Sequence, residues 1–161
     1  MLTATGGNMR SIRAFLIATL LVCTVVSSVA DAATPAQGTL SKKVKVVKWT
    51  GTFTLSQPNP VTADCVGGAT DPICDHFMLK VDLPDGARIR VVIPLTDQPG
   101  DLDLHVYAPN GSLVGSSTEF LAPEAVEFRH SARFRNQPYE VRVVPWLVIP
   151  GQSYAGTAEV R

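Results

Sequence analysis

The sequence predicts an all-β protein: an antiparallel β-sandwich of jelly-roll type with about eight strands, placed after an N-terminal signal helix. Three observations predict this class. Apolar and polar residues alternate with period two along most of the chain after residue 45, which is typical of half-buried strands. Twelve Gly and twelve Pro indicate many turns. No segment after the leader keeps a helical period, so a helical bundle is excluded.

Composition limits the possible partners. Fourteen Lys and Arg balance fourteen Asp and Glu, so there is no basic excess to neutralise the phosphates of a nucleic acid. Hydrophobic residues make up 45% of the 161 residues and charged residues 17%, which is typical of a folded chain. We therefore expect one folded domain that does not bind nucleic acid.

Residues 1–32 have the pattern of a secretory signal peptide. Arg10 and Arg13 precede an uncharged apolar stretch over 14–30, and the small residues Ala30 and Ala32 mark a cleavage site. We expect cleavage after Ala32 and a secreted or extracytoplasmic protein.

Two points about this leader stay open. Translation can start at Met1 or at Met9, because Met9 opens a more compact signal. The alternative to cleavage is a retained membrane anchor, although the uncharged stretch is at the lower limit of length for a span. Contact with a membrane is expected only through this segment if it stays uncleaved.

The elements follow in chain order. Residues 33–45 are small and polar, and we interpret them as a flexible tether before a sandwich domain over 46–161. In the first strand Val47, Trp49 and Phe53 share one face, while Lys48 and Thr50 share the other. Turn residues separate the later alternating segments. These later strands are expected near 77–83, 89–93, 102–107, 113–116, 125–129, 139–144 and 153–160.

A disulfide between Cys65 and Cys74 is expected. Cys23 leaves with the signal peptide, and the two remaining Cys of an exported chain favour one bridge. Closing such a short loop stabilises a fold by roughly 2–3 kcal/mol. The alternative is a redox-active or metal-binding pair.

Three segments carry a resemblance to a known family. Residues 101–117 read DLDLHVYAPNGSLVGSS, residues 139–143 read YEVRV, and residues 151–157 read GQSYAGT. In this order they resemble the bacterial pre-peptidase C-terminal domain, whose pattern is roughly DxDLYVYDPxGxLVxSS, then YxVxV, then GxxYxG. The resemblance covers residues 77–160. It differs at His105, where the family has Tyr.

The resemblance implies a jelly-roll-like sandwich that bacteria export. Such modules sit beside secreted peptidases or other hydrolases and are not themselves catalytic. No catalytic domain accompanies the module in this sequence.

A row of polar residues is the sharpest candidate for a metal site. Period two places Asp101, Asp103, His105 and Tyr107 on one face of a strand, and Asp97 lies just upstream. Carboxylate oxygens of Asp97, Asp101 and Asp103 suit calcium if loop carbonyls complete the shell. A structural role, in which the carboxylates accept loop N–H groups, is the competing interpretation. Zinc through His105 is a third.

Aromatic residues are the candidates for ligand contact. Trp146 lies between Pro145 and Pro150, in a predicted loop, and Tyr154 follows it. Both are candidate ligand-binding residues, although a loop Trp can also plug the end of a sandwich. Trp49 lies on an apolar face and is expected in the core. The local basic patch of Arg129, Arg133 and Arg135 is a weaker candidate for contact with an acidic polymer.

No catalytic residues are predicted. The sequence has neither a GxSxG elbow nor an HExxH motif, and its three His lie on different predicted strands. We expect an exported non-catalytic accessory or binding module for an extracellular polymer, a cell-wall component or a secreted enzyme. The alternatives are a structural or chaperone-like leader (or a fragment) of a larger secreted hydrolase, and a small hydrolase.

Overall fold

The computed structural model describes residues 33–53, 65, 74–94, 100–120 and 123–161. These residues form nine strands and one short 3-10 turn, η2 (Ala132–Phe134). The strands are β1 (Gln37–Ser41), β2 (Val46–Phe53), β3 (Asp75–Asp82), β4 (Arg88–Ile93), β5 (Asp101–Tyr107), β6 (Leu113–Ser117), β7 (Glu124–Arg129), β8 (Pro138–Leu147) and β9 (Gln152–Val160).

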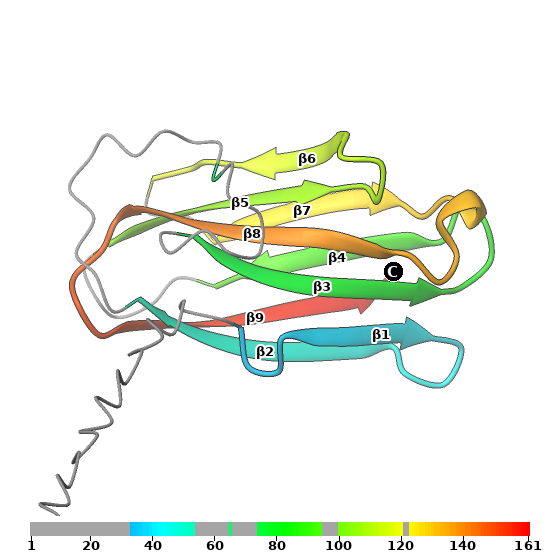
Figure 1. Ribbon diagram of the computed structural model, residues 1–161, viewed down its shortest axis with the longest axis horizontal. Coiled ribbons are helices and arrows are strands. Elements are labelled where there is room, and N and C mark those ends of the chain that lie inside the picture. The colour runs from blue at the N-terminus through cyan, green and yellow to red at the C-terminus, as the bar shows by residue number, and fades with distance from the viewer. Residues whose placement is uncertain (1–32, 54–64, 66–73, 95–99, 121–122) are drawn as a thin grey trace, which may run out of the picture.

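Two sheets pack face to face (Figure 1). One has five strands in the order β1-β3-β8-β5-β6, and the other has four in the order β2-β9-β4-β7. The pairings are antiparallel except for β1 with β3, which is parallel. The predicted all-β sandwich is confirmed, with nine strands in place of about eight. In the described residues, no helix is long and apolar enough to cross a membrane.

The core lies between the sheets and is built from the apolar face of each strand. Trp49 of β2 stacks on Phe77 of β3 across the layers, with ring centroids 4.1 Å apart. Trp49 is 2% exposed, so the expectation of a core residue is confirmed. A Cβ on Gly156 of β9 would lie 2.1 Å from Trp49 Cε2, so the indole needs glycine beside it.

The predicted flexible tether over 33–45 is corrected by the structure. It contains β1, which pairs with residues 78–82 of β3, and Leu40 of β1 is fully buried in the core. Ala33 is also buried, and Thr34 pairs with Thr50 of β2. One buried Leu gives too short an alternation to predict a strand from the sequence. The strand is defined instead by its backbone hydrogen bonds to β3. Within the described part of the chain, the sandwich therefore begins at Ala33.

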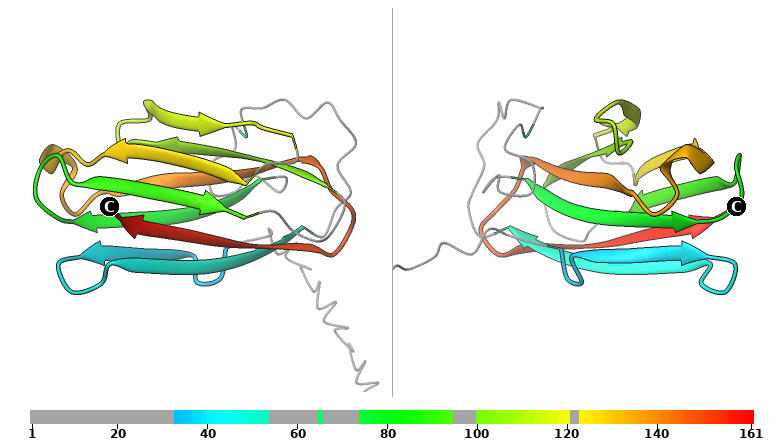
Figure 2. Two further views of the ribbon diagram at one scale, coloured as in Figure 1. Left: turned by 180° about the vertical axis from the view of Figure 1, so that it is seen from behind. Right: turned by 45° about the vertical axis from the view of Figure 1, so that its right-hand side comes forward.

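The views in Figure 2 show that the connections gather at the two ends of the sandwich. β5 and β7 begin at the same end at which β6 and β8 finish, and the chain turns there from β8 into β9. The opposite end holds the turns from β1 to β2 and from β3 to β4, together with η2.

Candidate functional site

A hollow opens at the end of the sandwich where β5 begins and β6 and β8 finish. It has a volume of about 470 Å³ and is lined by Asp101, Asp103, Thr118, Phe120 and Trp146. We call it the acidic-aromatic hollow. It brings together three residues that the sequence singled out, Asp101, Asp103 and Trp146.

Strand geometry explains why both carboxylates reach the hollow. Asp101 and Asp103 alternate along β5 with Leu102 and Leu104, whose side chains pack in the core. Asp101 is 9% exposed and Asp103 is 7% exposed. Both carboxylates are thus largely withdrawn from bulk water while still lining the cavity.

Trp146 reaches the hollow from a β-bulge, which corrects the predicted loop. Leu102 pairs with Pro145 and Asp101 pairs with Leu147, so Trp146 is an extra residue in β8. The described ladder between β3 and β8 ends at the pair of Asp75 and Val143, before Pro145, so no β3 partner needs the missing N–H. Bulges commonly turn a side chain toward a site, and Trp146 is half-buried here.

Phe120 and Thr118 complete the lining from the segment after β6. Phe120 is 66% exposed, the largest value among the exposed large hydrophobic residues of the described chain. Nothing in the sequence pattern pointed to these two residues. Only the pairing of β6 with β5 brings them beside Trp146.

Negative charge accumulates around Asp103. Burial raises its pKa to about 6, and the nearby charges of Asp101 and Glu124 act in the same direction. Burial also raises the pKa of Asp101 and of Glu124. None of the ion pairs between described residues involves these three carboxylates.

The structure describes only some of the residues of the predicted metal site. Asp97 lies outside the described residues. Within the described part of the chain, no three His, Cys, Asp or Glu side chains are grouped so that they could hold a metal ion. His105 follows on the same face of β5, and its ring lies 6.4 Å from that of Tyr107. Calcium at Asp101 and Asp103 stays a prediction.

Tyr154 lies away from the hollow, and its predicted role in ligand contact is corrected. It is 3% exposed, and its hydroxyl donates a hydrogen bond to Asp75 Oδ2 at 2.6 Å. Its inward position follows from the alternation of β9, where Ala158 is also buried.

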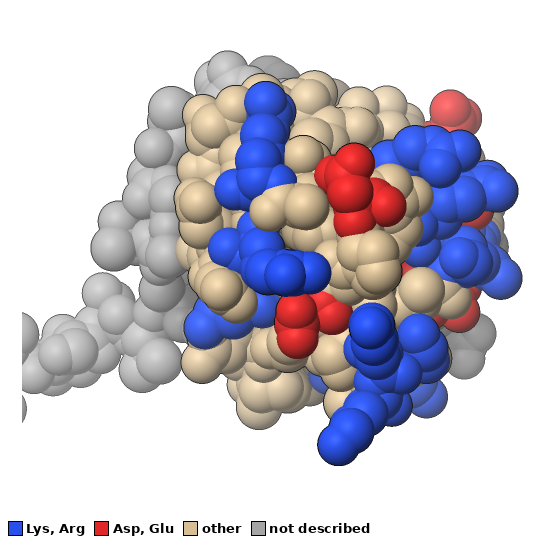
Figure 3. Space-filling model, turned by 90° about the vertical axis from the view of Figure 1, so that its right-hand side faces the viewer, with Lys and Arg blue, Asp and Glu red and all other residues tan. Residues whose placement is uncertain are grey.

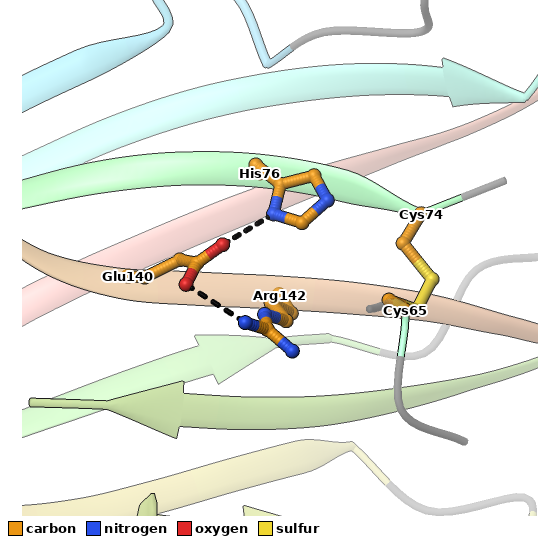
Figure 4. The surroundings of a disulfide bond; sticks show 5 residues. All are labelled: Cys65, Cys74, His76, Glu140 and Arg142. Carbon is orange, nitrogen blue, oxygen red and sulfur yellow. Dashed lines mark hydrogen bonds and ion pairs between the residues drawn. A yellow bond between two sulfur atoms is a disulfide. The ribbon is translucent and has the colours of Figure 1, made fainter. Parts of the chain in front are cut away.

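The structure links Cys65 to Cys74, the pair that the sequence predicted, with Cα atoms 5.9 Å apart (Figure 4). Both Cys are buried with Val144 of β8. Nearby, Glu140 accepts hydrogen bonds from His76 at 2.6 Å and from Arg142 at 3.0 Å. Burial alone would raise the pKa of Glu140, but these two donors outweigh it and the pKa is lowered. This network is a structural tie between β3 and β8.

Basic residues gather at the opposite end (Figure 3). A second hollow there, of about 360 Å³, is lined by Ser41, Lys42, Lys43, Asp82, Leu83, Pro84 and Arg135. The three Arg of the predicted basic patch all have partners. Arg129 donates to Gly86 O at 3.3 Å, Arg133 lies 4.4 Å from the Phe134 ring centre, and Arg135 pairs with Asp82 at 3.8 Å.

Fold and hollow together define a disulfide-linked β-sandwich with an aromatic and acidic recess at one end. No protein-family model matches the sequence, and no curated protein matches it. Among solved structures, the pre-peptidase C-terminal domain of collagenase from Bacillus anthracis is similar. The identity is 8%, the TM-score 0.45, and the match covers 78% of this chain and 94% of that one. These values do not place the chain in that family, so membership stays a prediction.

Proposed function

We propose that this protein is an exported, non-catalytic accessory module that binds an extracellular polysaccharide through the acidic-aromatic hollow. The observation that carries the proposal is the composition of that hollow. Two accessible aromatic side chains and two carboxylates, which form no ion pair among the described residues, share one open cavity.

Each part of the lining suits a sugar polymer. The rings of Trp146 and Phe120 present flat apolar faces, against which a sugar ring stacks with little loss of side-chain entropy. The carboxylates of Asp101 and Asp103 accept hydrogen bonds from hydroxyl or ammonium groups, and charge-assisted bonds of this kind are strong. Their negative charge disfavours an anionic polymer. The hollow therefore favours a neutral or amino-substituted polysaccharide.

Several residues that a hydrolase could use have structural partners away from the hollow. Both Cys outside the leader form the disulfide. His130 is 1% exposed and lies 3.1 Å from the Tyr139 hydroxyl, and His76 is held by Glu140. We expect no hydrolysis of peptide, ester or glycoside substrates above background.

Retention on insoluble polymers tests the proposal. The exported protein is passed over chitosan, chitin, cellulose, bacterial cell walls and collagen, and the bound fraction is measured. Trp146→Ala should abolish retention while lowering the free energy of unfolding by less than about 1.5 kcal/mol, because the ring is half-buried. Leu113→Ala is the matched control, since Leu113 is 52% exposed and does not line the hollow.

Three results would count against the proposal. The first is retention on a polymer that survives both Trp146→Ala and Phe120→Ala. The second is a loss of about 3 kcal/mol or more in the free energy of unfolding on Trp146→Ala, which would mark a core residue. The third is turnover of a glycoside. Absence of retention on every polymer would favour the structural-leader interpretation.

A further inference from the structure

A buried carboxylate lies where Ala33, the first residue that the structure describes, enters the core. Asp75, at the start of β3, is 0% exposed. Its Oδ1 accepts a hydrogen bond from the backbone N–H of Ala33 at 2.6 Å, and its Oδ2 accepts one from the Tyr154 hydroxyl at 2.6 Å. Gly51 closes the remaining side, because a Cβ there would be 2.1 Å from Oδ2.

This carboxylate is surrounded by neutral donors. Burial raises the pKa of Asp75 despite the hydrogen bonds from Tyr154, from Ala33 and from the His76 amide. Among the described residues, the one charge interaction that favours the ionised form of Asp75 comes from His76, whose ring is held by Glu140. A buried carboxylate in such surroundings is costly unless a positive charge comes within hydrogen-bond distance.

The backbone fixes the nitrogen of Ala33 at this carboxylate. The Ala33 side chain is 2% exposed and belongs to the core cluster. Thr34 exchanges two backbone hydrogen bonds with Thr50, at 2.7 Å and 3.0 Å, and Ala36 O accepts one from Met78 N–H at 3.0 Å. The segment enters the sandwich in one defined path, with the Ala33 nitrogen aimed at Oδ1.

The sequence places a cleavage site at the same nitrogen. The small residues Ala30 and Ala32 predict hydrolysis of the bond between Ala32 and Ala33. Hydrolysis consumes one water, leaves a carboxylate on Ala32 and converts the Ala33 amide nitrogen into a primary amine. With an ordinary pKa of about 8, this amine is protonated at neutral pH.

We propose that leader removal turns the Ala33 nitrogen into an α-ammonium that forms a buried ion pair with Asp75, so that processing itself completes the sandwich. The inference rests on the export part of the proposed function and is independent of the acidic-aromatic hollow. The nitrogen that now donates one N–H to Oδ1 would donate as a cation from the same position.

The ion pair has a defined pH dependence. While Asp75 is ionised, it raises the pKa of the ammonium above its unfolded value, so the stabilisation is present below about pH 8 and is lost as the pH rises through the folded value. Protonation of Asp75, whose pKa is raised by burial, removes the ion pair in acid. Of the residues that the structure describes, the Tyr154 hydroxyl and the His76 imidazole are the other titratable groups that face Asp75.

Amine labelling of the exported protein tests the proposal. The full chain is expressed with its leader, the product is recovered outside the cytoplasm, and its N-terminus is read by mass spectrometry. We expect Ala33 as the first residue. At pH 7.5 an exposed α-amine reacts faster than lysine, because its pKa is lower by about two units. The Ala33 amine should instead be modified at least tenfold more slowly than Lys42 and Lys43, which are exposed.

Variants separate the ion pair from simple burial. Asp75→Asn should abolish the protection of the amine, and its melting temperature should no longer fall above about pH 8. Asp82→Asn, at an exposed carboxylate, is the matched control and should behave as wild type. Tyr154→Phe should keep the amine protected. If Asp75→Asn does not fold, the labelling rates of the wild type and of Tyr154→Phe provide the test.

An N-terminus at another residue, or a wild-type Ala33 amine that reacts faster than the lysines, would overturn the inference. Either result leaves polymer retention by the hollow unaffected. Failed retention with a protected Ala33 amine would instead remove the proposed binding function alone.

Discussion

Asp103 is the residue whose titration should control the acid side of the stability profile. Its pKa is raised to about 6, above the unfolded value near 4. A carboxyl with a raised pKa stabilises the fold below the unfolded value, and that stabilisation is lost as the pH rises through 6. Asp103→Asn should therefore be more stable than wild type at pH 7 and equal to it at pH 4.

Chemical denaturation at several pH values, in the presence of chelator, measures this difference. Asp82→Asn is the control, because Asp82 is exposed and far from the hollow. An Asp103→Asn profile parallel to that of wild type would contradict the prediction.

The same carboxylates give the calcium prediction its test. If Asp101 and Asp103 bind calcium with loop oxygens, the ion stabilises the folded state by mass action. Chelator should then lower the melting temperature, added calcium should restore it, and Asp103→Ala should lose this response. A melting temperature that neither chelator nor calcium changes would contradict the calcium prediction and support a structural role for Asp101 and Asp103.

At the scale of elements, β1 should be an integral part of the sandwich. Leu40 is 0% exposed and packs with the core. Leu40→Ala should lower the free energy of unfolding by about 2–4 kcal/mol, as large-to-small core substitutions do. Val44→Ala, at a residue 46% exposed in the following turn, should cost less than about 0.5 kcal/mol. Equal effects of Leu40→Ala and Val44→Ala in denaturant titrations would contradict this prediction and support a flexible tether.

The sequence predicted those elements whose alternation is long. β3 and β4 each bury three apolar residues on one face, and β2 buries Trp49 and Phe53 on the same face as the half-buried Val47, so the positions of these strands follow from that period. β1 has one strong apolar residue, so only its tertiary pairing defines it. The extension of β8 was hidden by Pro145, because the rule against proline in strands does not apply where a neighbouring strand has ended.

The hollow was predictable only in pieces. Asp101 and Asp103 follow from the period of β5, and Trp146 was a candidate through its flanking prolines. Their meeting with Phe120 depends on the bulge in β8 and on the position of β6, which are long-range properties. The hydrogen bond between Ala33 and Asp75 joins residues 42 positions apart, so no local sequence pattern predicts it either.

For the whole molecule, the disulfide should contribute measurable stability. Intact mass should show both thiols of Cys65 and Cys74 absent from protein recovered outside the cytoplasm, and reduction should lower the free energy of unfolding by about 2–3 kcal/mol. A double Cys→Ser variant is the control for the reductant. Two thiols that react freely under native conditions would contradict the prediction.

The pairing of β2 with β9 governs when this protein can fold. Val46 of β2 lies opposite Glu159 of β9, so β2 cannot form its ladder until β9 is present. β9 also lies between β2 and β4 in the sheet. Ladders between such distant segments make folding slow, because the intervening chain must be ordered before any contact is gained. The four-stranded sheet therefore cannot assemble before β9 has been synthesised. Until residue 159 has been synthesised, β2 and β4 have no β9 between them, and their apolar faces are accessible to a chaperone or to a protease.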